Sequence, residues 1–269
     1  MIQLEKYGRS LHAQISLGTT SDDRFMPNGY VKAFAEMTDV IGTEKLDGQN
    51  GCFKKSGVYA RSHVAPTELP WDKPMKERWN LIKNDLGDLE LFGEGMYGVH
   101  SIAYKNLESY YYIFGVRQKD YWMSWEEVKF YAEMFDFPTV PEIPIKTKLK
   151  DFYRDDVPEN KLLDMWLKEN LGVSWEDSVK TPGMLGGYNA ISGEDASEGF
   201  VFKNAEGYYM NDGVLPVEYN EFNNLFKIVR QGHVQTDDVH WTKTWKEAEL
   251  INYSKHNWDS YSYLSNKNF

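Results

Sequence analysis

The hexapeptide Lys45-Leu46-Asp47-Gly48-Gln49-Asn50 carries the most information about this chain of 269 residues. It places an amine, an acid, a flexible glycine and a carboxamide close together. Glycine lets the backbone approach a ligand closely, and the acid can hold a metal or favour one charge state of the amine. These residue types suit covalent transfer of a nucleotide to the lysine. The pattern Lys-x-Asp-Gly alone, however, arises by chance in roughly one chain in sixteen of this size.

Three downstream segments fit the same chemistry in a fixed order. They are Leu91-Phe92-Gly93-Glu94-Gly95, Glu198-Gly199-Phe200-Val201-Phe202-Lys203 and Phe226-Lys227-Ile228-Val229-Arg230. Each segment places a charged side chain among apolar residues that can form a strand. The prediction therefore depends on the order and spacing of all four segments together.

The composition favours one large folded domain. Apolar residues make up 41% and aromatic residues 15%, which argues for a substantial core and against wholesale disorder. The net charge of −11 argues against a protein that coats nucleic acid by charge alone, but it is compatible with transient binding in a local groove. We expect one domain over residues 1–242, and a short tail over 243–269 with no separate second domain.

The cysteine content and the hydropathy bear on the cellular compartment. Cys52 is the only cysteine, so an intrachain disulfide and a cysteine-based zinc site are excluded. Residues 1–6 lack the apolar run of a signal peptide, and no stretch is long enough to span a bilayer. We therefore expect a soluble cytoplasmic protein, a monomer, with no membrane contact and with Cys52 as a small core residue.

The residue pattern predicts an α+β fold with antiparallel sheets flanked by helices, because strands and helices do not alternate regularly. Strands are expected over 52–55, 58–62, 89–93 and 110–116, in a hairpin of 199–203 with 208–211, and in the segment that ends at Lys45. Ser124-Trp125-Glu126-Glu127 is a capping box that opens a helix reaching about Phe135. Further helices are expected over 158–171 and over 217–226, the second of which would deliver Lys227.

The ordered set of segments resembles the covalent nucleotidyltransferase superfamily of ligases and capping enzymes. Within it, the chain most resembles the phage RNA ligases of the RNA ligase 2 type. Three features are similar to that type: Asn50 after the lysine motif, Ala60-Arg61-Ser62-His63 soon after it, and Phe114 at the end of an aromatic strand. The resemblance spans about residues 35–240 and implies a ligase-type nucleotidyltransferase (adenylyltransferase) domain.

This resemblance implies an ATP-dependent RNA ligase for RNA repair, encoded by a phage and acting in the host cytoplasm. Lys45 would attack the α-phosphate of ATP, form lysyl-AMP and release pyrophosphate. AMP would then pass to a 5′-phosphate on RNA, and a 3′-hydroxyl would attack this RNA-adenylate and seal the strand. A lysine has an ordinary pKa near 10.4, so roughly one in 2,500 is neutral at pH 7. We therefore expect burial, neighbouring lysines and a metal to favour the free amine.

The resemblance also implies roles for the other residues. Asp47, Glu94 and Glu198 are expected around Mg²⁺ or Mn²⁺, which prefer oxygen ligands, and Glu94 is alternatively associated with the ribose hydroxyls. Phe114 is expected to stack on adenine. The implied nucleotide-binding set is Glu44, Leu46, Asn50, Arg61, Glu94, Phe114, Glu198, Lys203 and Lys227. The implied RNA-binding set is Arg61, Lys146, Lys148 and Arg230.

Two departures from the family pattern remove a charged residue each. Lys203 and Lys227 are the expected cations for the α-phosphate, but the family's second cation in the last motif is replaced by Val229. Arg230 follows one position later, so either it swings in or another residue supplies the contact. Gly115 stands where an acid is common in the family.

Two further patterns have a structural explanation beside a functional one. Lys146, Lys148 and Lys150 alternate along an expected strand and could follow an RNA backbone, but a solvated edge strand explains them better. A zinc site is disfavoured, because lone histidines in loops are more often surface or hydrogen-bonded residues. The residues weighed for that zinc site are His63, His233, His240, Asp237 and Asp238.

Three competing functions stay open. A capping-type mRNA guanylyltransferase would use the same lysine chemistry with GTP, and a DNA ligase would seal a different polymer. A non-catalytic domain of the same fold would bind RNA ends without any protein–AMP adduct. NAD⁺ is disfavoured as the donor, because only 44 residues precede Lys45.

Overall fold

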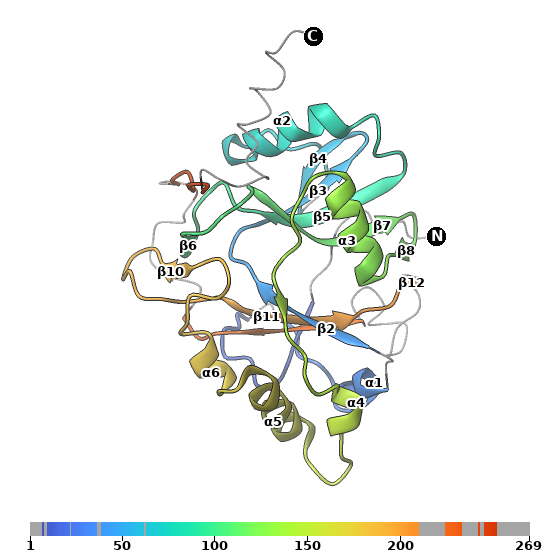
Figure 1. Ribbon diagram of the computed structural model, residues 1–269, viewed down its shortest axis with the longest axis vertical. Helices are drawn as coiled ribbons and strands as arrows, with labels where there is room; N and C mark the ends of the chain where they lie inside the picture. The colour runs from blue at the N-terminus through green and yellow to red at the C-terminus, as the bar shows by residue number, and fades with distance from the viewer. Residues whose placement is uncertain are drawn as a thin grey trace.

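The computed structural model of the chain describes residues 7, 10–21, 23–36, 39–61, 63–209, 224–232, 242 and 245–251. Two β-sheets lie at its centre, one above the other in Figure 1, and helices cover their outer faces. The lower, five-stranded sheet has the order β1 (Leu11–His12), β13 (Leu225–Val229), β11 (Gly199–Asn204), β2 (Val40–Lys45), β9 (Glu142–Ile143). The upper, six-stranded sheet has the order β12 (Tyr208–Tyr209), β8 (Tyr121–Trp122), β7 (Tyr111–Gln118), β5 (Leu89–Gly95), β3 (Gln49–Lys54), β4 (Gly57–Ala60). A separate antiparallel pair consists of β6 (Ile102–Tyr104) and β10 (Gly187–Asn189).

Each sheet packs its outer face on its own group of helices (Figure 1). The upper group is η1 (Pro70–Asp72), α2 (Lys73–Ile82) and α3 (Trp125–Met134), and the lower group is α1 (Tyr30–Ala35), α4 (Leu149–Phe152), α5 (Glu159–Leu171) and α6 (Trp175–Ser178). Side chains alternate between the two faces of a strand. Along β11, Phe200 and Phe202 therefore pack in the lower core with Trp166 of α5, whereas Lys203 reaches across to β7 of the upper sheet. The inner faces of the two sheets thus face each other.

The predicted fold class, α+β with antiparallel sheets flanked by helices, is confirmed. Paired strands run antiparallel in both sheets, except that β1 and β13 are parallel. The capping box is also present, because the Ser124 hydroxyl accepts a hydrogen bond from the Glu127 N–H and the Glu127 carboxylate accepts one from the Ser124 N–H. The expected strands over 52–55, 58–62, 89–93 and 110–116 correspond to β3, β4, β5 and β7, and the expected helix over 158–171 corresponds to α5.

Two predictions around β11 and β13 are wrong. The expected hairpin of 199–203 with 208–211 is not present in its described part, because β2 and β13 occupy both sides of β11 while β12 (Tyr208–Tyr209) pairs with β8; residues 210 and 211 lie outside the described residues. Lys227 is delivered by a strand and not by a helix, since Leu225 and Phe226 already belong to β13. Residues 217–223 of the expected helix lie outside the described residues.

The expected lysine-bearing edge strand is also wrong. The carboxamide oxygen of Asn170 accepts hydrogen bonds from the N–H groups of Lys146 and Thr147, at 2.7 and 2.9 Å, and α4 begins directly after Lys148. The Lys148 ammonium lies 2.6 Å from Asp39. These residues therefore form a bend that Asn170 stabilises, and the alternating lysines do not lie on one face of a strand.

The described C-terminal segment, residues 245–251, packs on the loop after β5. The Val99 N–H donates to the Lys246 carbonyl at 2.9 Å, and the Ala248 N–H donates to the Tyr97 carbonyl at 2.7 Å. The side chain of Ala248 is buried. This part of the predicted tail therefore contacts the main body of the fold. Among the described residues, we find no helix with the length and apolar character needed to cross a membrane.

Candidate active site

Lys45 lies at the end of β2, on the inner face of the lower sheet. Its partner across the strand pair is Gly199 at the start of β11, so Glu198 lies beside Lys45 although the two are 153 positions apart in the sequence. The Lys45 Nζ atom lies 2.7 Å from Oε1 and 2.8 Å from Oε2 of Glu198. Burial of Phe200 in the lower core fixes the register that brings this pair together.

Glu94 lies on β5 and contacts the tight turn between β2 and β3 that directly follows Lys45. The Gly48 N–H donates a hydrogen bond to Oε1 of Glu94 at 3.2 Å. A Cβ atom at position 48 would lie 2.5 Å from the carbonyl oxygen of Gly95, so a larger residue would push the turn away from β5. The glycine of the lysine motif is therefore needed for a close approach between two backbones, whereas the sequence suggested a close approach to a ligand.

Asp47 is held by the loop that precedes β6. Its Oδ2 atom accepts hydrogen bonds from the Ile102 N–H at 2.8 Å and from the Ser101 hydroxyl at 2.5 Å. The N–H of Asp47 donates to the Tyr104 hydroxyl at 2.8 Å. The same loop is bonded through Val99 to the C-terminal segment 245–251. The position of Asp47 thus depends on contacts that reach the end of the described chain.

These carboxylates determine the charge of Lys45. Burial lowers the pKa of Lys45, but the carboxylates of Glu198, Glu94 and Asp47 outweigh it, and the pKa is raised. The three acids therefore favour the ammonium form of Lys45. Burial raises the pKa of Glu198 to about 7 and that of Glu94 to about 8, although Lys45 opposes both shifts. A proton acceptor with a pKa near neutral pH thus directly contacts the ammonium group.

Lys227 reaches the site from β13, two strands away from β2. Its Nζ atom lies 3.6 Å from Oδ1 of Asp23, and the same oxygen lies 3.2 Å from Nε2 of His12. Burial and the charge of Lys45 lower the pKa of Lys227 to about 8, while Asp23 and Glu198 oppose this change. Burial and the charge of Lys227 lower the pKa of His12 to about 4, so His12 is neutral at pH 7.

His12 and Asp23 were not predicted as site residues. No motif surrounds either of them, and His12 comes beside Lys227 only because β1 pairs in parallel with β13 from the other end of the chain. A parallel pair between distant segments leaves no local signal in the sequence.

Two other predicted residues border the same region. Arg61 is exposed directly after β4, and its charge contributes to lowering the pKa of Lys227. Asn50 lies opposite Glu94 in the pairing of β3 with β5. Its Oδ1 atom is buried and has no hydrogen-bond partner among the described residues. Both side chains are thus available for a ligand in the space between the sheets.

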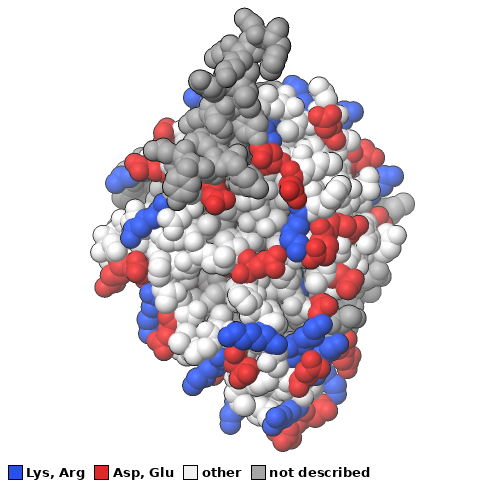
Figure 2. Space-filling model, in the orientation of Figure 1, with Lys and Arg blue, Asp and Glu red and all other residues white. Residues whose placement is uncertain are grey.

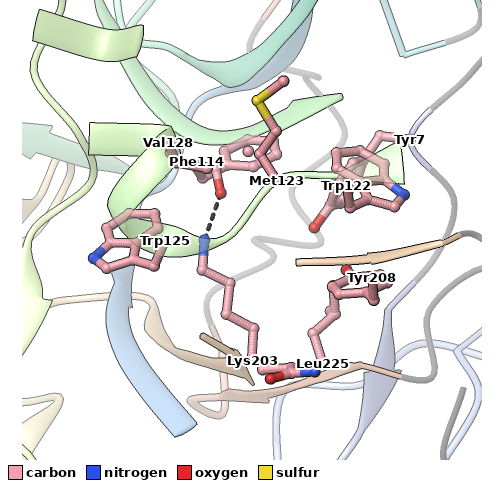
Figure 3. A pocket seen from close by; sticks show the side chains of 11 residues that line it. Tyr7, Phe114, Trp122, Met123, Trp125, Val128, Lys203, Tyr208 and Leu225 are labelled. Carbon is pink, nitrogen blue, oxygen red and sulfur yellow. Dashed lines mark hydrogen bonds between the residues drawn. The ribbon is translucent and has the colours of Figure 1, made fainter. Parts of the chain in front are cut away.

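Lys203 and Phe114 meet in an aromatic pocket, which Figure 3 shows from close by. The Lys203 ammonium donates to the Phe114 carbonyl at 2.5 Å and lies 3.8 Å from the ring centre of Trp125. Burial lowers the pKa of Lys203 to about 7. Tyr7 and Trp122 line the pocket on its other side (Figure 3). Phe114 thus lies among aromatic side chains, but the open space of about 20 Å³ holds only about one water molecule.

The aromatic pocket and Lys45 lie at opposite ends of the same strand pair. Lys203 pairs with Ile41, whereas Lys45 pairs with Gly199. A strand rises about 3.3 Å per residue, so the backbones of the two lysines are about 13 Å apart. Lys203 is therefore not grouped with Lys45 and Lys227 in this arrangement.

Glu44 and Leu46 flank Lys45 but point elsewhere. Leu46 is 2% exposed and belongs to the upper core. Glu44 is 5% exposed, and its carboxylate accepts a hydrogen bond from the Met184 N–H at 3.0 Å. Burial raises the pKa of Glu44 to about 7. Neither side chain is brought to Lys45, so only their backbones could contact a nucleotide beside it.

The carboxylates around Lys45 suit a divalent metal by their chemistry, since Mg²⁺ and Mn²⁺ prefer oxygen ligands. In the described part of the chain, however, no three His, Cys, Asp or Glu side chains are arranged as direct ligands. Both Glu198 oxygens contact Lys45, and Oδ2 of Asp47 is bonded to Ser101 and Ile102. The residues therefore fit a metal that is held mainly through water molecules. The residues His233, Asp237, Asp238 and His240, weighed for zinc, lie outside the described residues.

The chain belongs to the RNA ligase family, whose sequence model matches residues 38–229. The predicted family is thus confirmed. No curated protein is similar enough to this sequence to be a match.

Three solved structures illustrate the wider similarity. An archaeal ATP-dependent RNA ligase is 13% identical, with a TM-score of 0.47, over 84% of this chain and 48% of that one. An RNA ligase of Naegleria gruberi is 16% identical, with a TM-score of 0.43, over 86% of this chain and 61% of that one. A putative ATP-dependent DNA ligase of Aquifex aeolicus is 14% identical, with a TM-score of 0.41, over 84% and 50%. The chain therefore spans about half to three fifths of the length of these proteins.

Proposed function

We propose that this protein is an ATP-dependent RNA ligase that joins a 5′-phosphate to a 3′-hydroxyl. The observation that carries the proposal is the contact of Lys45 with Glu198, with Glu94 and Asp47 beside it, in a member of the RNA ligase family. The acids raise the pKa of Lys45, so the amine needs a base to take its proton before it can attack, and Glu198 is in direct contact with it.

In the first step, the Lys45 nitrogen attacks the α-phosphorus of ATP. A phosphorus–nitrogen bond forms, the bond from the α-phosphorus to the bridging oxygen breaks, and pyrophosphate leaves. The proton of the Lys45 ammonium passes to Glu198, which lies 2.7 Å away and has a pKa of about 7. Lys227, whose pKa is about 8, is cationic at pH 7 and stabilises the charge on the phosphate.

In the second step, an oxygen of the RNA 5′-phosphate attacks the phosphorus of lysyl-AMP, and a phosphorus–oxygen bond forms. The phosphorus–nitrogen bond breaks in the transfer, and the Lys45 amine takes its proton back. In the third step, the 3′-hydroxyl oxygen attacks the phosphorus of the RNA 5′-phosphate, the bond from that phosphorus to AMP breaks, AMP leaves and the hydroxyl proton passes to water. Arg61, which is exposed and close enough for its charge to lower the pKa of Lys227, would hold an incoming RNA phosphate. Asn50, with its buried unpaired Oδ1, is positioned to orient the reacting end.

The cofactors of this proposal are ATP and Mg²⁺ or Mn²⁺. Phe114 would stack on the adenine, which requires its aromatic neighbours to move apart, because the space between them is about 20 Å³ (Figure 3). Glu94, Glu198 and Asp47 would hold the metal mainly through water molecules, and the metal would neutralise charge on the α-phosphate and the leaving pyrophosphate.

The cellular setting is part of the same proposal. A single, buried Cys52 suits a reducing compartment, which supports RNA repair in the cytoplasm. The phage origin, the monomeric state and the domain boundary at residue 242 stay predictions.

A sealing assay tests the function. Purified protein with Mg²⁺ is given labelled ATP or GTP, and 5′-phosphorylated RNA or DNA ends as single strands or as nicked duplexes. We expect label from ATP on the protein, then on RNA ends, and joined RNA as the product. Label from GTP alone would indicate a guanylyltransferase, and sealing of DNA alone a DNA ligase. RNA-end binding without any adduct would indicate a non-catalytic domain.

A further inference from the structure

A cavity of about 290 Å³ lies at the end of the five-stranded sheet where Lys45 is found, but it does not include Lys45. Its walls come from α6 and the residues after it, from the turn that precedes β11, and from Arg230 just after β13. The volume is at the lower end of the range for ligand pockets and suits about one nucleotide. The Arg230 N–H donates to the Glu198 carbonyl at 2.9 Å, so the cavity adjoins the residue that holds Lys45.

The guanidinium group of Arg230 indicates which kind of ligand the cavity would bind. Its Nε and Nη2 atoms are buried, and neither has a hydrogen-bond partner within the described ranges. A buried donor without an acceptor is costly, whereas a guanidinium fork matches a phosphate with two parallel hydrogen bonds. Val229, in the position of the family's second cation, is buried and apolar, so Arg230 is the charged residue at this end of β13.

The other walls of the cavity carry three acids and one further cation, Lys180, whose ammonium group lies 2.7 Å from Asp177. Glu176 comes from α6, while Glu194 and Asp195 come from the turn before β11. Acidic and basic side chains lie next to each other in this part of the molecule, at the lower left of Figure 2. Acids repel a free anion, so the cavity is poorly suited to phosphate alone. Carboxylates do accept hydrogen bonds from hydroxyl groups, and a ribonucleotide presents both a phosphate and a 2′-hydroxyl.

We propose that this cavity binds one ribonucleotide of the RNA substrate near its reactive end. Arg230 contacts the phosphate, and Glu194 or Asp195 accepts a hydrogen bond from the 2′-hydroxyl. The inference rests on the proposed ligase function and adds to it a subsite that selects RNA over DNA. It also gives Arg230 a role separate from the α-phosphate of ATP.

The first test compares Arg230→Ala and Arg230→Lys with Lys161→Ala, which removes one exposed cation from α5. Adduct formation with ATP and Mg²⁺ is followed by intact mass, and transfer of AMP to a 5′-phosphorylated RNA oligonucleotide is followed on a gel. We expect the RNA-dependent step of Arg230→Ala to fall about ten-fold more than adduct formation, the loss expected for one charge-assisted hydrogen bond. Arg230→Lys should restore part of it, and Lys161→Ala should match the wild type. Equal losses in both steps would overturn the proposal, because Arg230 would then act on Glu198.

The second test does not require ligation. Binding of the same RNA oligonucleotide and of its DNA counterpart is measured by fluorescence anisotropy for the wild type, Arg230→Ala and the double variant Glu194→Gln, Asp195→Asn. We expect weaker RNA binding by Arg230→Ala and a smaller RNA-to-DNA preference for the double variant. RNA binding unaffected by Arg230→Ala would refute the subsite even if the protein proved not to be a ligase.

Discussion

The buried carboxylate of Glu44 gives a quantitative prediction about stability. Glu44 is 5% exposed, and its Oε1 atom has no hydrogen-bond partner among the described residues. Burial raises its pKa from the ordinary 4.5 to about 7, although the Met184 N–H opposes the shift. Since the folded pKa is the higher one, the folded protein keeps a proton that the unfolded chain loses above pH 4.5. Stability therefore falls as the pH rises from about 4.5 to 7, and the full cost is present above pH 7.

The size of this cost follows from the two pKa values. One pKa unit corresponds to about 1.4 kcal/mol, so the difference between 4.5 and about 7 amounts to about 3 kcal/mol. Glu44→Gln keeps an acceptor for the Met184 N–H but carries no charge. We expect it to raise the free energy of unfolding by up to about 3 kcal/mol at pH 8 and by less than about 1 kcal/mol at pH 5.

Urea unfolding followed by tryptophan fluorescence at pH 5 and pH 8 checks this expectation. Glu133→Gln, which changes an exposed carboxylate on α3, should stay within about 0.5 kcal/mol of the wild type at both pH values. A gain for Glu44→Gln that is the same at both pH values, or no gain at pH 8, would refute the reasoning from burial.

Three further predictions concern the surroundings of Lys45. Gly48→Ala should lower the rate of adduct formation about 100-fold, because the added Cβ would lie 2.5 Å from a backbone oxygen and would displace the turn. Gly51→Ala should have a smaller effect, because the nearest atom to its added Cβ is 3.3 Å away. Adduct formation and melting temperature are measured for both variants. The Asp23 carboxylate raises the pKa of Lys227, so Asp23→Asn should lower this pKa below about 8. Adduct formation should then be lost at a lower pH than in the wild type as the pH is increased. An unchanged pH profile of adduct formation would contradict the role of Lys227. Ala248→Asp places a charge in a buried contact of the C-terminal segment and should lower the free energy of unfolding by about 1–3 kcal/mol. It should also slow adduct formation, because this segment is bonded to the loop that holds Asp47. The exposed control Glu249→Ala should leave the free energy of unfolding and the rate of adduct formation unchanged within error.

The parts of the fold that were predictable from sequence are those with a local signal. The Ser124 capping box and the apolar strands around Leu91 and Ile113 are specified by neighbouring residues, and the structure has them. The strand that ends at Lys45 and the approach of Glu198 followed from motif order, because both lie at the ends of paired strands.

The errors arose where distant segments decide the structure. Residues 199–203 and 208–211 were predicted to form a hairpin, but β11 pairs with β2 and β13. A sequence window of a dozen residues holds no information on that choice of partners. His12 and Asp23 reach Lys227 through long-range pairing, so no spacing rule would have found them. The effect of the three acidic neighbours on the pKa of Lys45 could not be predicted either, because it depends on distances that the sequence does not contain.

The central claim is that the amine of Lys45 forms a covalent bond with AMP. The most direct measurement is intact mass followed by peptide mapping after incubation with ATP and Mg²⁺, for the wild type, Lys45→Ala and the exposed control Lys55→Ala. We predict one AMP on Lys45 in the wild type and in Lys55→Ala, and none on a folded Lys45→Ala protein. An AMP adduct on Lys45→Ala, or a wild-type adduct that maps to another residue, would contradict the account.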